Sequence, residues 1–381
     1  MNHNIGSPKF KVGVLGGGQL GRMLIQEAIN FNIDIHILDV EGSPCSLVAS
    51  HFKNGNIKDF EDVLNFGKDL DVLTIEIENV NIEALYELEK RGVKVYPQPK
   101  VIELIQDKGK QKEFYVVNNF PTAPYLLVND LAETESNIDY IPFVQKLRTG
   151  GYDGKGVQTI TSISDLEKGF DAPCVLEKFV DLEKELSVIV ARNENGETMS
   201  FPVVEQEFNN EANLVEFLFS PADISSTIEE TAQEIAKSII TKLDMVGLLA
   251  VEFFLSKTGE LFVNEIAPRP HNSGHQTIEG NITSQFEQHL RSICGLPLGS
   301  TGIIKPSVMI NLLGAKGYEG AAVYKGIHDI LRIDGVYPHL YGKEMTKPFR
   351  KMGHITIVHN NLDKAKEIAH LVKETIQVIS E

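Results

Sequence analysis

The stretch KVGVLGGGQLGRMLIQEA, from Lys11 to Ala28, joins a short apolar segment to an amphipathic one through a run of glycines. The first segment predicts a buried strand, and the second has apolar residues at helical spacing. Gly16, Gly18 and Gly21 follow the pattern Gly-x-Gly-x-x-Gly, which permits a tight strand-to-helix turn whose amides face an anion. With the predicted strand DIHILDV that follows, the stretch indicates a βαβ unit and therefore a parallel sheet.

The pattern alone leaves the ligand of this turn open. A dinucleotide is one interpretation, because Asp39 ends the second predicted strand 18 residues after Gly21, where a ribose-binding acid is expected. A turn that only packs a helix on a strand is another. A third is a different anionic ligand, since Gln19 and Arg22 place polar side chains at the mouth of the turn.

Composition narrows the class of protein. The chain has 381 residues, 42% hydrophobic and 23% charged, which predicts a globular protein of two to three domains. Its net charge of −17 argues against nucleic-acid or membrane partners. Three widely spaced cysteines fit neither a disulfide framework nor a zinc site, and the N-terminus lacks a signal-peptide core. We therefore expect a protein of the reducing cytoplasm.

Three parts are expected along the chain. Strand and helix patterns alternate as far as YPQPK near residue 100, which predicts a Rossmann-like parallel-sheet domain over residues 1–100. A helix from about Val101 to Asn118, followed by short strands around TGGYDGKG, predicts a small α+β lid over residues 101–180. Longer strands from ELSVIVARN onward predict a large mixed-sheet domain over residues 181–381.

The segments LLAVEFFL and ELFVNEIA flank SKTG and predict an antiparallel hairpin. If Thr258 and Gly259 are its two turn residues, Glu252 lies opposite Glu265. Such carboxylates, roughly 5 Å apart at Cβ, repel each other unless a cation lies between them. A solvated surface pair is the alternative, but the neighbouring residues are apolar. We therefore favour a Mg²⁺ site that also takes phosphate oxygens.

Two further segments suit a nucleotide. The loop TGGYDGKG, from Thr149 to Gly156, could close its amides over a polyphosphate, although glycine density also fits a flexible hairpin tip. Lys146 precedes this loop on a predicted strand and faces the same side. The segment LEKFV, from Leu176 to Val180, could offer backbone groups to adenine, with Glu185 near the ribose.

Positive charge concentrates at the end of an acidic chain. The segments NEIAPRPHNSGH, HLYGK and PFRKMGH supply Arg269, His271, Lys343, Arg350 and Lys351. Each is individually compatible with a surface charge, but together they suit a phosphorylated substrate. The prolines on both sides of Arg269 stiffen the backbone and favour a binding role there.

In chain order, GGGQLGRM, TGGYDGKG, NEIAPRPHNSGHQTIEG and HLYGK…RKMGH resemble the N5-carboxyaminoimidazole ribonucleotide synthetases of purine biosynthesis. The resemblance runs from about Lys11 to the end of the chain. It implies the ATP-grasp fold, with a pre-ATP-grasp domain, a lid and a large domain. It also implies a homodimeric carbon-nitrogen ligase that uses Mg²⁺ or Mn²⁺. The implied reaction converts ATP, bicarbonate and 5-aminoimidazole ribonucleotide, through carboxyphosphate, to the N5-carboxylated product, ADP and phosphate.

The resemblance also implies site residues. Those for ATP are Lys108, Lys146, Gly151, Tyr152, Asp153, Gly154, Lys155, Gly156, Glu177, Lys178, Phe179, Val180, Glu185, Asn264 and Glu265. Those for the ribonucleotide are Gln19, Leu20, Glu78, Asp153, Asn272, Lys343, Arg350 and Lys351. Arg269, His271 and Lys343 are the implied catalytic residues, and Glu252 and Glu265 the implied metal ligands.

Three positions depart from the family pattern. Phe208 stands where relatives usually carry a histidine, and Lys108 stands where arginine is common. In relatives a glutamine often follows the last glycine of the glycine-rich loop directly, whereas here Gln158 follows it one residue later. Two other activities stay open as alternatives. They are a formate-dependent glycinamide ribonucleotide transformylase, from the same superfamily, and a nicotinamide oxidoreductase. The second would leave the opposed glutamates and the basic cluster unexplained, and a non-catalytic nucleotide-binding module would leave an intact set of site residues unused.

Overall fold

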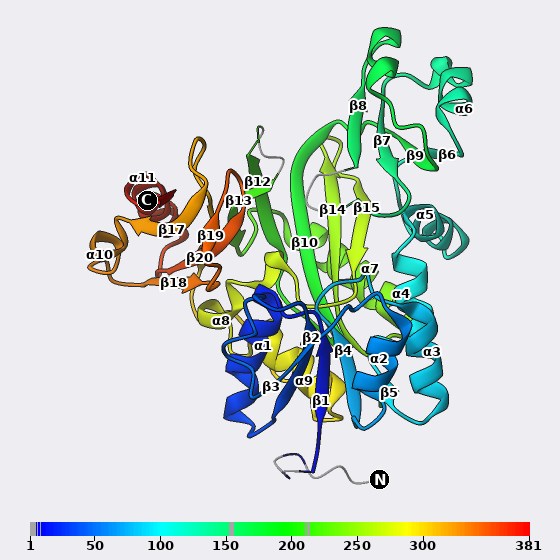
Figure 1. Cartoon of the computed structure of the whole chain (residues 1–381). Helices are drawn as coiled ribbons and strands as arrows, with labels where there is room; N and C mark the ends of the chain where they lie inside the picture. Colours follow the sequence, from blue (N-terminus) through cyan, green and yellow to red (C-terminus); the bar gives the residue numbers. More distant parts are fainter. Residues whose placement is uncertain (1–4, 6, 8, 152–155, 210, 212–213) are drawn as a thin grey trace.

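The computed structural model describes residues 5, 7, 9–151, 156–209, 211 and 214–381 (Figure 1). Of the predicted site residues, Tyr152, Asp153, Gly154 and Lys155 lie outside this described part. Figure 1 shows three lobes around long central strands: an N-terminal one at the bottom, a small one at upper right and a C-terminal one at left. No helix within the described residues has both the length and the apolar content needed to cross a bilayer.

The N-terminal lobe is the parallel sheet that the alternating pattern predicted. Its strands lie in the order β3-β2-β1-β4-β5, and all their pairings are parallel. The strands are β1 Val12–Leu15, β2 Ile35–Asp39, β3 His51–Asn54, β4 Val72–Ile75 and β5 Lys94–Val95. The helices are α1 Gln19–Asn30, α2 Phe60–Gly67 and α3 Ile82–Lys90. Apolar residues of α1 pack with those of α9 (Gln285–Ile293), which fixes this lobe to the large sheet.

The glycine turn before α1 is closed by the chain's own carboxylates. The Gly17 amide donates to Asp39 Oδ2 at 2.7 Å. The amides of Gly18 and Leu20 donate to the two oxygens of Glu76, at 2.6 and 2.9 Å. A Cβ on Gly18 would lie only 2.4 Å from that carboxylate, so a larger residue there would displace Glu76. Glu76 thus occupies the position that a dinucleotide phosphate would take, which argues against the dinucleotide interpretation.

The predicted single helix from Val101 to Asn118 is wrong, because the structure has two helices there. They are α4 (Pro99–Ile105) and α5 (Lys108–Val117). Asp107 starts the second one, since its side chain accepts hydrogen bonds from the Gly109 and Lys110 amides at 2.7 and 3.3 Å. Because α5 begins at Lys108, Lys108 and Lys112 lie one turn apart on the same face.

The small lobe is an antiparallel sheet in the order β6-β9-β7-β8. Its elements are β6 Tyr125–Val128, α6 Leu131–Ser136, η1 Ile138–Tyr140, β7 Phe143–Leu147, β8 Val157–Ile160, η2 Ile163–Lys168 and β9 Cys174–Lys178. Val144 pairs with Glu177 and Lys146 pairs with Val175, so Lys146 and Glu177 are diagonal neighbours on one face. The predicted strands PFVQKLR and CVLEKFV are confirmed as β7 and β9.

The remaining chain forms a large antiparallel sheet and a small satellite sheet. The large sheet runs β15-β14-β10-β12-β13-β16-β20-β18, with β11 beside β10. Its strands are β10 Leu182–Arg192, β11 Thr198–Ser200, β12 Val204–Asn209, β13 Leu214–Ser220, β14 Gly247–Ser256, β15 Leu261–Ala267, β16 Ser307–Leu313, β18 Val336–Leu340 and β20 Lys351–Val358. The satellite strands are β17 Gly320–Lys325, β19 Met345–Thr346 and β21 Gln377–Ser380. The other helices are α7 Ser226–Lys242, η3 Asn272–Gly274, α8 Thr277–Gly280, α10 Ile327–Ile330 and α11 Leu362–Thr375.

A bulge in the β14–β15 hairpin shapes the site. Near the turn, Leu255 pairs with Leu261 and Phe253 with Val263, so the predicted two-residue turn is wrong. The register then shifts by one residue at Asn264, and Glu252 does face Glu265 as predicted. The extra residue interrupts the alternation of side chains, so neighbouring Asn264 and Glu265 both line one pocket.

The closed turn before α1 makes a testable prediction. We expect Glu76→Ala to lower the free energy of unfolding by about 1–3 kcal/mol, because it leaves the Gly18 and Leu20 amides without their acceptor. Chemical denaturation monitored by circular dichroism measures this change. Glu41→Ala, at an exposed glutamate of the same lobe, is the control. Equal stability of the two variants would contradict this role for Glu76.

Candidate active site

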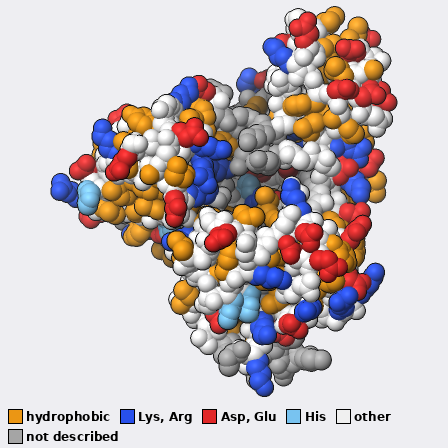
Figure 2. Space-filling model, in the orientation of Figure 1, with side chains coloured by type: hydrophobic (Ala, Val, Ile, Leu, Met, Phe, Trp, Pro, Cys, Tyr) orange, Lys and Arg blue, Asp and Glu red, His pale blue; other side chains and the backbone are white. Residues whose placement is uncertain are grey.

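The three lobes meet around a hollow. Figure 2 shows Lys and Arg side chains gathered along its wall on the side of the C-terminal lobe. In Figure 1, the small lobe, α5 and the β14–β15 hairpin lie to the right of the C-terminal lobe. The predicted site residues come from all of these elements.

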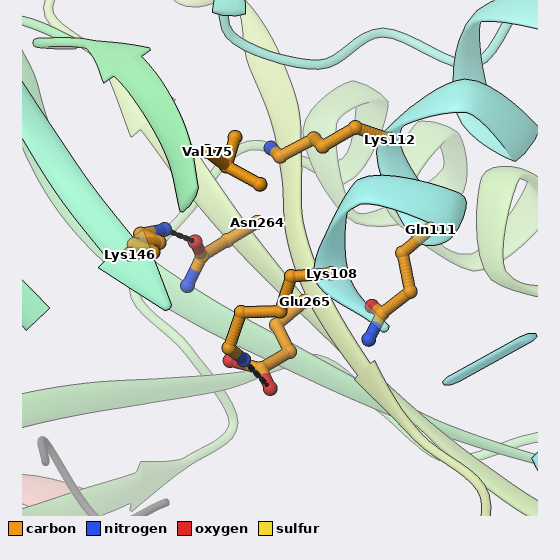
Figure 3. Close-up of a pocket in the computed structure, with 7 residues that line it drawn as sticks. All are labelled: Lys108, Gln111, Lys112, Lys146, Val175, Asn264 and Glu265. Carbon is orange, nitrogen blue, oxygen red and sulfur yellow. Dashed lines mark hydrogen bonds and ion pairs between the residues drawn. The ribbon is translucent and has the colours of Figure 1, made fainter. Parts of the chain in front are cut away.

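One pocket collects side chains from the small lobe, α5 and the hairpin (Figure 3). Its lining consists of Lys108, Gln111, Lys112, Lys146, Val175, Asn264 and Glu265. Lys146 Nζ donates to Asn264 Oδ1 at 2.8 Å, and Lys108 forms an ion pair with Glu265. Four of the residues predicted for ATP therefore come together, although they are up to 157 positions apart in the chain.

Glu177 is held between two lysines next to this pocket. One carboxylate oxygen pairs with Lys112, and the other lies 2.5 Å from Lys146 Nζ. Burial alone would raise the pKa of Glu177, but Lys146 and Lys112 outweigh it and lower this pKa. Since the carboxylate is already paired and only 3% exposed, a contact of Glu177 with adenosine would use its backbone.

The acidic side of the site is the Glu252–Glu265 pair with Glu185 nearby. Burial, followed by the charges of Glu265 and Glu185, raises the pKa of Glu252 to about 7. Burial would also raise the pKa of Glu265, but Lys108 is the first of several cations that lower it. Carboxylates crowded in this way fit a hard divalent cation. The described residues contain no cluster of three or more potential metal-binding side chains, so two carboxylates would leave room for phosphate oxygens and water.

The proposed catalytic pair, Arg269 and His271, lies beside these acids. Arg269 Nε is 2.9 Å from Glu78 Oε1. His271 Nδ1 is 2.9 Å from Ser273 Oγ, and its Nε2 is 3.9 Å from Glu252 Oε1. His271 therefore lies at the predicted metal site. Arg269, two residues earlier in the chain, pairs with Glu78, which was predicted for the ribonucleotide.

The predicted ribonucleotide residues occupy several elements. Lys343 Nζ donates to the Lys351 carbonyl at 2.7 Å, which places the Lys343 ammonium beside the backbone of β20. Arg350 is bound to the Met345 carbonyl at 2.5 Å. The Asn272 side chain exchanges two hydrogen bonds of 2.9 Å with Asn311, so its amide is firmly oriented.

At the glycine turn, Gln19 begins α1 and is half-buried, whereas Leu20 lies in the apolar core and is 8% exposed. The Leu20 amide donates to Glu76, so a ligand contact through that amide would have to replace this bond.

The residues predicted for adenosine begin at the end of β9. Lys178 Nζ donates to the Tyr140 carbonyl at 2.5 Å and lies 4.1 Å from the centre of its ring. Phe179 is 46% exposed and available to a flat ligand. The glycine-rich loop is described at its two ends, where Gly151 is half-buried and Gly156 has a φ of +78°. Phe208, at the position of the expected histidine, packs on an apolar cluster of β12, β13 and β16.

The structure adds residues that the sequence analysis did not assign. Lys112 lines the pocket and holds Glu177. Arg22 reaches the C-terminal lobe, because a Cβ on Gly342 would lie 3.2 Å from Arg22 Nη1. A signal existed for both residues. Lys112 follows Lys108 at helical spacing, and Arg22 stands within the glycine motif.

The acidic cluster predicts a pH dependence of stability. Burial raises the pKa of Glu185 from 4.5 to about 7 in the folded chain, so folding loses stability as the pH rises through this interval. We expect Glu185→Gln to match the wild type at pH 4.5 and to be more stable by about 1–3 kcal/mol at pH 8. Urea unfolding at both pH values measures this difference. Glu183→Gln, at an exposed position of the same strand, is the control. An equal gain in stability at both pH values would contradict the prediction.

Comparisons with known proteins agree with this geometry. Three family models match in succession: a ribonucleotide synthetase preATP-grasp domain (residues 9–106), an ATP-grasp domain (residues 113–286) and a phosphoribosylaminoimidazole carboxylase C-terminal domain (residues 307–368). The phosphoribosylaminoimidazole carboxylase of Vigna aconitifolia is 39% identical over 92% of this chain, which spans 64% of that relative's length.

Solved structures match over nearly the whole chain. The N5-carboxyaminoimidazole ribonucleotide synthetase of Thermotoga maritima is 43% identical, with a TM-score of 0.90 over 98% of this chain and 100% of its own. The N5-carboxyaminoimidazole synthase of Aspergillus clavatus, in complex with ADP and 5-aminoimidazole ribonucleotide, is 34% identical. Its TM-score is 0.87 over 96% of this chain and 98% of its own. The fold is thus the predicted ATP-grasp fold, and the chain belongs to the N5-carboxyaminoimidazole ribonucleotide synthetase family.

Proposed function

We propose that this chain is a ligase that carboxylates 5-aminoimidazole ribonucleotide with bicarbonate at the expense of ATP. The products are N5-carboxyaminoimidazole ribonucleotide, ADP and phosphate. The observation that carries the proposal is the proximity of three groups: Lys108 and Lys146 line one pocket with Glu265, Glu265 faces Glu252, and His271 Nε2 lies 3.9 Å from Glu252 Oε1. These groups match the phosphates of ATP, a divalent cation and bicarbonate in turn.

The nucleotide would lie between the small lobe and the hairpin. Lys108 and Lys146 would neutralise its phosphates, while the segment from Lys178 to Val180 and Glu185 would receive adenosine. Glu252 and Glu265 would hold Mg²⁺ or Mn²⁺, because two crowded carboxylates supply the hard oxygen ligands that such ions prefer. When bound, the ion would offset the negative charge of the phosphates during phosphoryl transfer. The residues 151–156, described only at their ends, would cover the phosphates.

Bicarbonate would be held by Arg269 and His271 at the acidic end of the cleft. A bicarbonate oxygen attacks the γ-phosphorus of ATP, the bond to ADP breaks, and carboxyphosphate forms. The exocyclic amine of the ribonucleotide then attacks the carboxyl carbon, directly or after release of CO₂. Phosphate leaves and the amine gives up one proton. A closed cleft that excludes water protects this labile intermediate.

The ribonucleotide would bind between α1 and the C-terminal lobe. Its 5′-phosphate would lie on the basic residues Lys343, Arg350 and Lys351, because the amides of the glycine turn already donate to Glu76. Gln19, Leu20, Glu78 and Asn272 would contact the rest of the ligand, with Asp153 near the aminoimidazole. We also propose that the protein is a cytoplasmic homodimer and that its three domains meet at residues 100 and 180. The Vigna relative's own name includes "chloroplastic".

An assay of ADP release tests the substrates. We expect ADP release to require bicarbonate, to rise with 5-aminoimidazole ribonucleotide and to be unaffected by formate with glycinamide ribonucleotide. Release with only the second pair would instead support the transformylase. In a thermal-shift measurement, Mg²⁺ with ATP should raise the midpoint and NAD should not. A rise of the midpoint with NAD alone would instead support the oxidoreductase interpretation.

The acidic pair gives a second test. Glu265→Gln should lower turnover at least about 100-fold while the fold is kept, because it removes a charge that both the metal and Lys108 would use. Steady-state ADP release and circular dichroism measure the two properties. Glu260→Gln, at an exposed position of the same hairpin, should retain full activity. Wild-type turnover in Glu265→Gln would remove this residue from the site.

A further inference from the structure

We propose that Lys112 is a positioning residue for the nucleotide: it holds the Glu177 carboxylate so that Lys146 keeps its charge for the phosphates of ATP. The proposal rests on the proposed function only in that ATP is the bound nucleotide. It concerns a residue that makes no direct phosphate contact in our assignment. Three features of the site support it.

The first feature is where Lys112 lies. It projects from α5 one turn after Lys108, toward β9 (Figure 3). Its side chain is 4% exposed, whereas Lys108 and Lys146 are 16% and 13% exposed. Lys112 Nζ pairs with Glu177 and donates to Thr122 Oγ1 at 2.7 Å. Lys112 is therefore the most buried of the three lysines that line the pocket.

The second feature is a continuous chain of contacts from Lys112 to the cleft. One oxygen of the Glu177 carboxylate pairs with Lys112 and the other with Lys146. Lys146 Nζ in turn donates to Asn264 Oδ1. Thr122 Oγ1 donates to the Val263 carbonyl at 2.9 Å, directly before the bulged Asn264. Lys112 thus links α5, the small lobe and the hairpin at the point where Lys146 is held.

The third feature is the charge balance. Lys112, Glu177 and Lys146 together carry one net positive charge, which remains for a phosphate. If Lys112 were neutral, the Glu177 carboxylate would have only Lys146 as its cation, and the pair would carry no net charge. Burial lowers the pKa of Lys112, and Glu177 is the main group that opposes this shift. Lys112 and Lys146 thus share the single carboxylate of Glu177, and neither lysine neutralises it alone.

The test measures nucleotide binding apart from carboxylation. Isothermal titration calorimetry with Mg²⁺ and the β,γ-imido analogue of ATP should show about 10–100-fold weaker binding to Lys112→Met. In turnover, the KM for ATP should rise while the KM for the ribonucleotide stays unchanged. Lys110→Met is the matched control, because Lys110 lies on the same helix but is 47% exposed and pairs with Glu103. Unchanged binding to folded Lys112→Met would overturn the proposal.

A second variant covers the possibility that Lys112→Met does not fold, since an unpaired buried carboxylate is destabilising. Adding Glu177→Gln removes that carboxylate and returns the full charge of Lys146 to the site. Since Glu177 would contact adenosine only through its backbone, we expect the double variant to bind the ATP analogue within about threefold of the wild type. If it folds but binds at least about tenfold more weakly, Lys112 contacts the nucleotide itself and the proposal is wrong. Absent carboxylation by the wild type would refute the proposed reaction and leave this binding test intact.

Discussion

The structure depends on two carboxylates that face each other on buried strands. Glu252 and Glu265 are directly paired in the β14–β15 hairpin, and their mutual repulsion contributes to the raised pKa of Glu252. Apolar neighbours would not tolerate such a pair unless cations or metal compensated it. Lys108 from α5 and Lys146 from β7 supply that compensation from two other parts of the chain. The acidic hairpin thereby determines where α5 and the small lobe must lie.

The compensating lysines are themselves part of a balanced network. Lys146 interacts with Asn264 and with Glu177, and Glu177 is shared with Lys112. In this arrangement the ammonium groups of Lys112 and Lys146 lie at the pocket but are largely shielded from solvent. A phosphate entering such a site meets cations whose positions are already fixed, which reduces the reorganisation needed on binding. The bulge at Asn264 is what allows one strand to contribute both a neutral and an acidic group to the same pocket.

Much of this could be predicted from local patterns. The parallel N-terminal sheet follows from periodicity. The facing glutamates were predicted from a two-residue turn; the pairing near the turn is in fact shifted by one residue, and the bulge at Asn264 restores the predicted pairing of Glu252 with Glu265. The pattern of the strand could not show this bulge, because it depends on tertiary contacts of Asn264. The break between α4 and α5 was missed although the sequence carries a signal for it: Asp107 is a good N-cap residue, and no apolar side chain lies between Ile105 and Phe114. Lys112 was missed because its partner Glu177 lies 65 positions away.

The glycine turn shows why a motif does not determine its ligand. The strand, the glycines and the helix are all present as in a dinucleotide site, but Glu76 and Asp39 accept hydrogen bonds from the Gly17, Gly18 and Leu20 amides. An anion approaching α1 therefore meets carboxylates at the helix end and needs cations from elsewhere. Arg22 lies near Gly342, beside Lys343, so α1 and the C-terminal lobe can together provide that charge. The phosphate of the proposed substrate is therefore better matched by these basic side chains than by the N-terminus of α1.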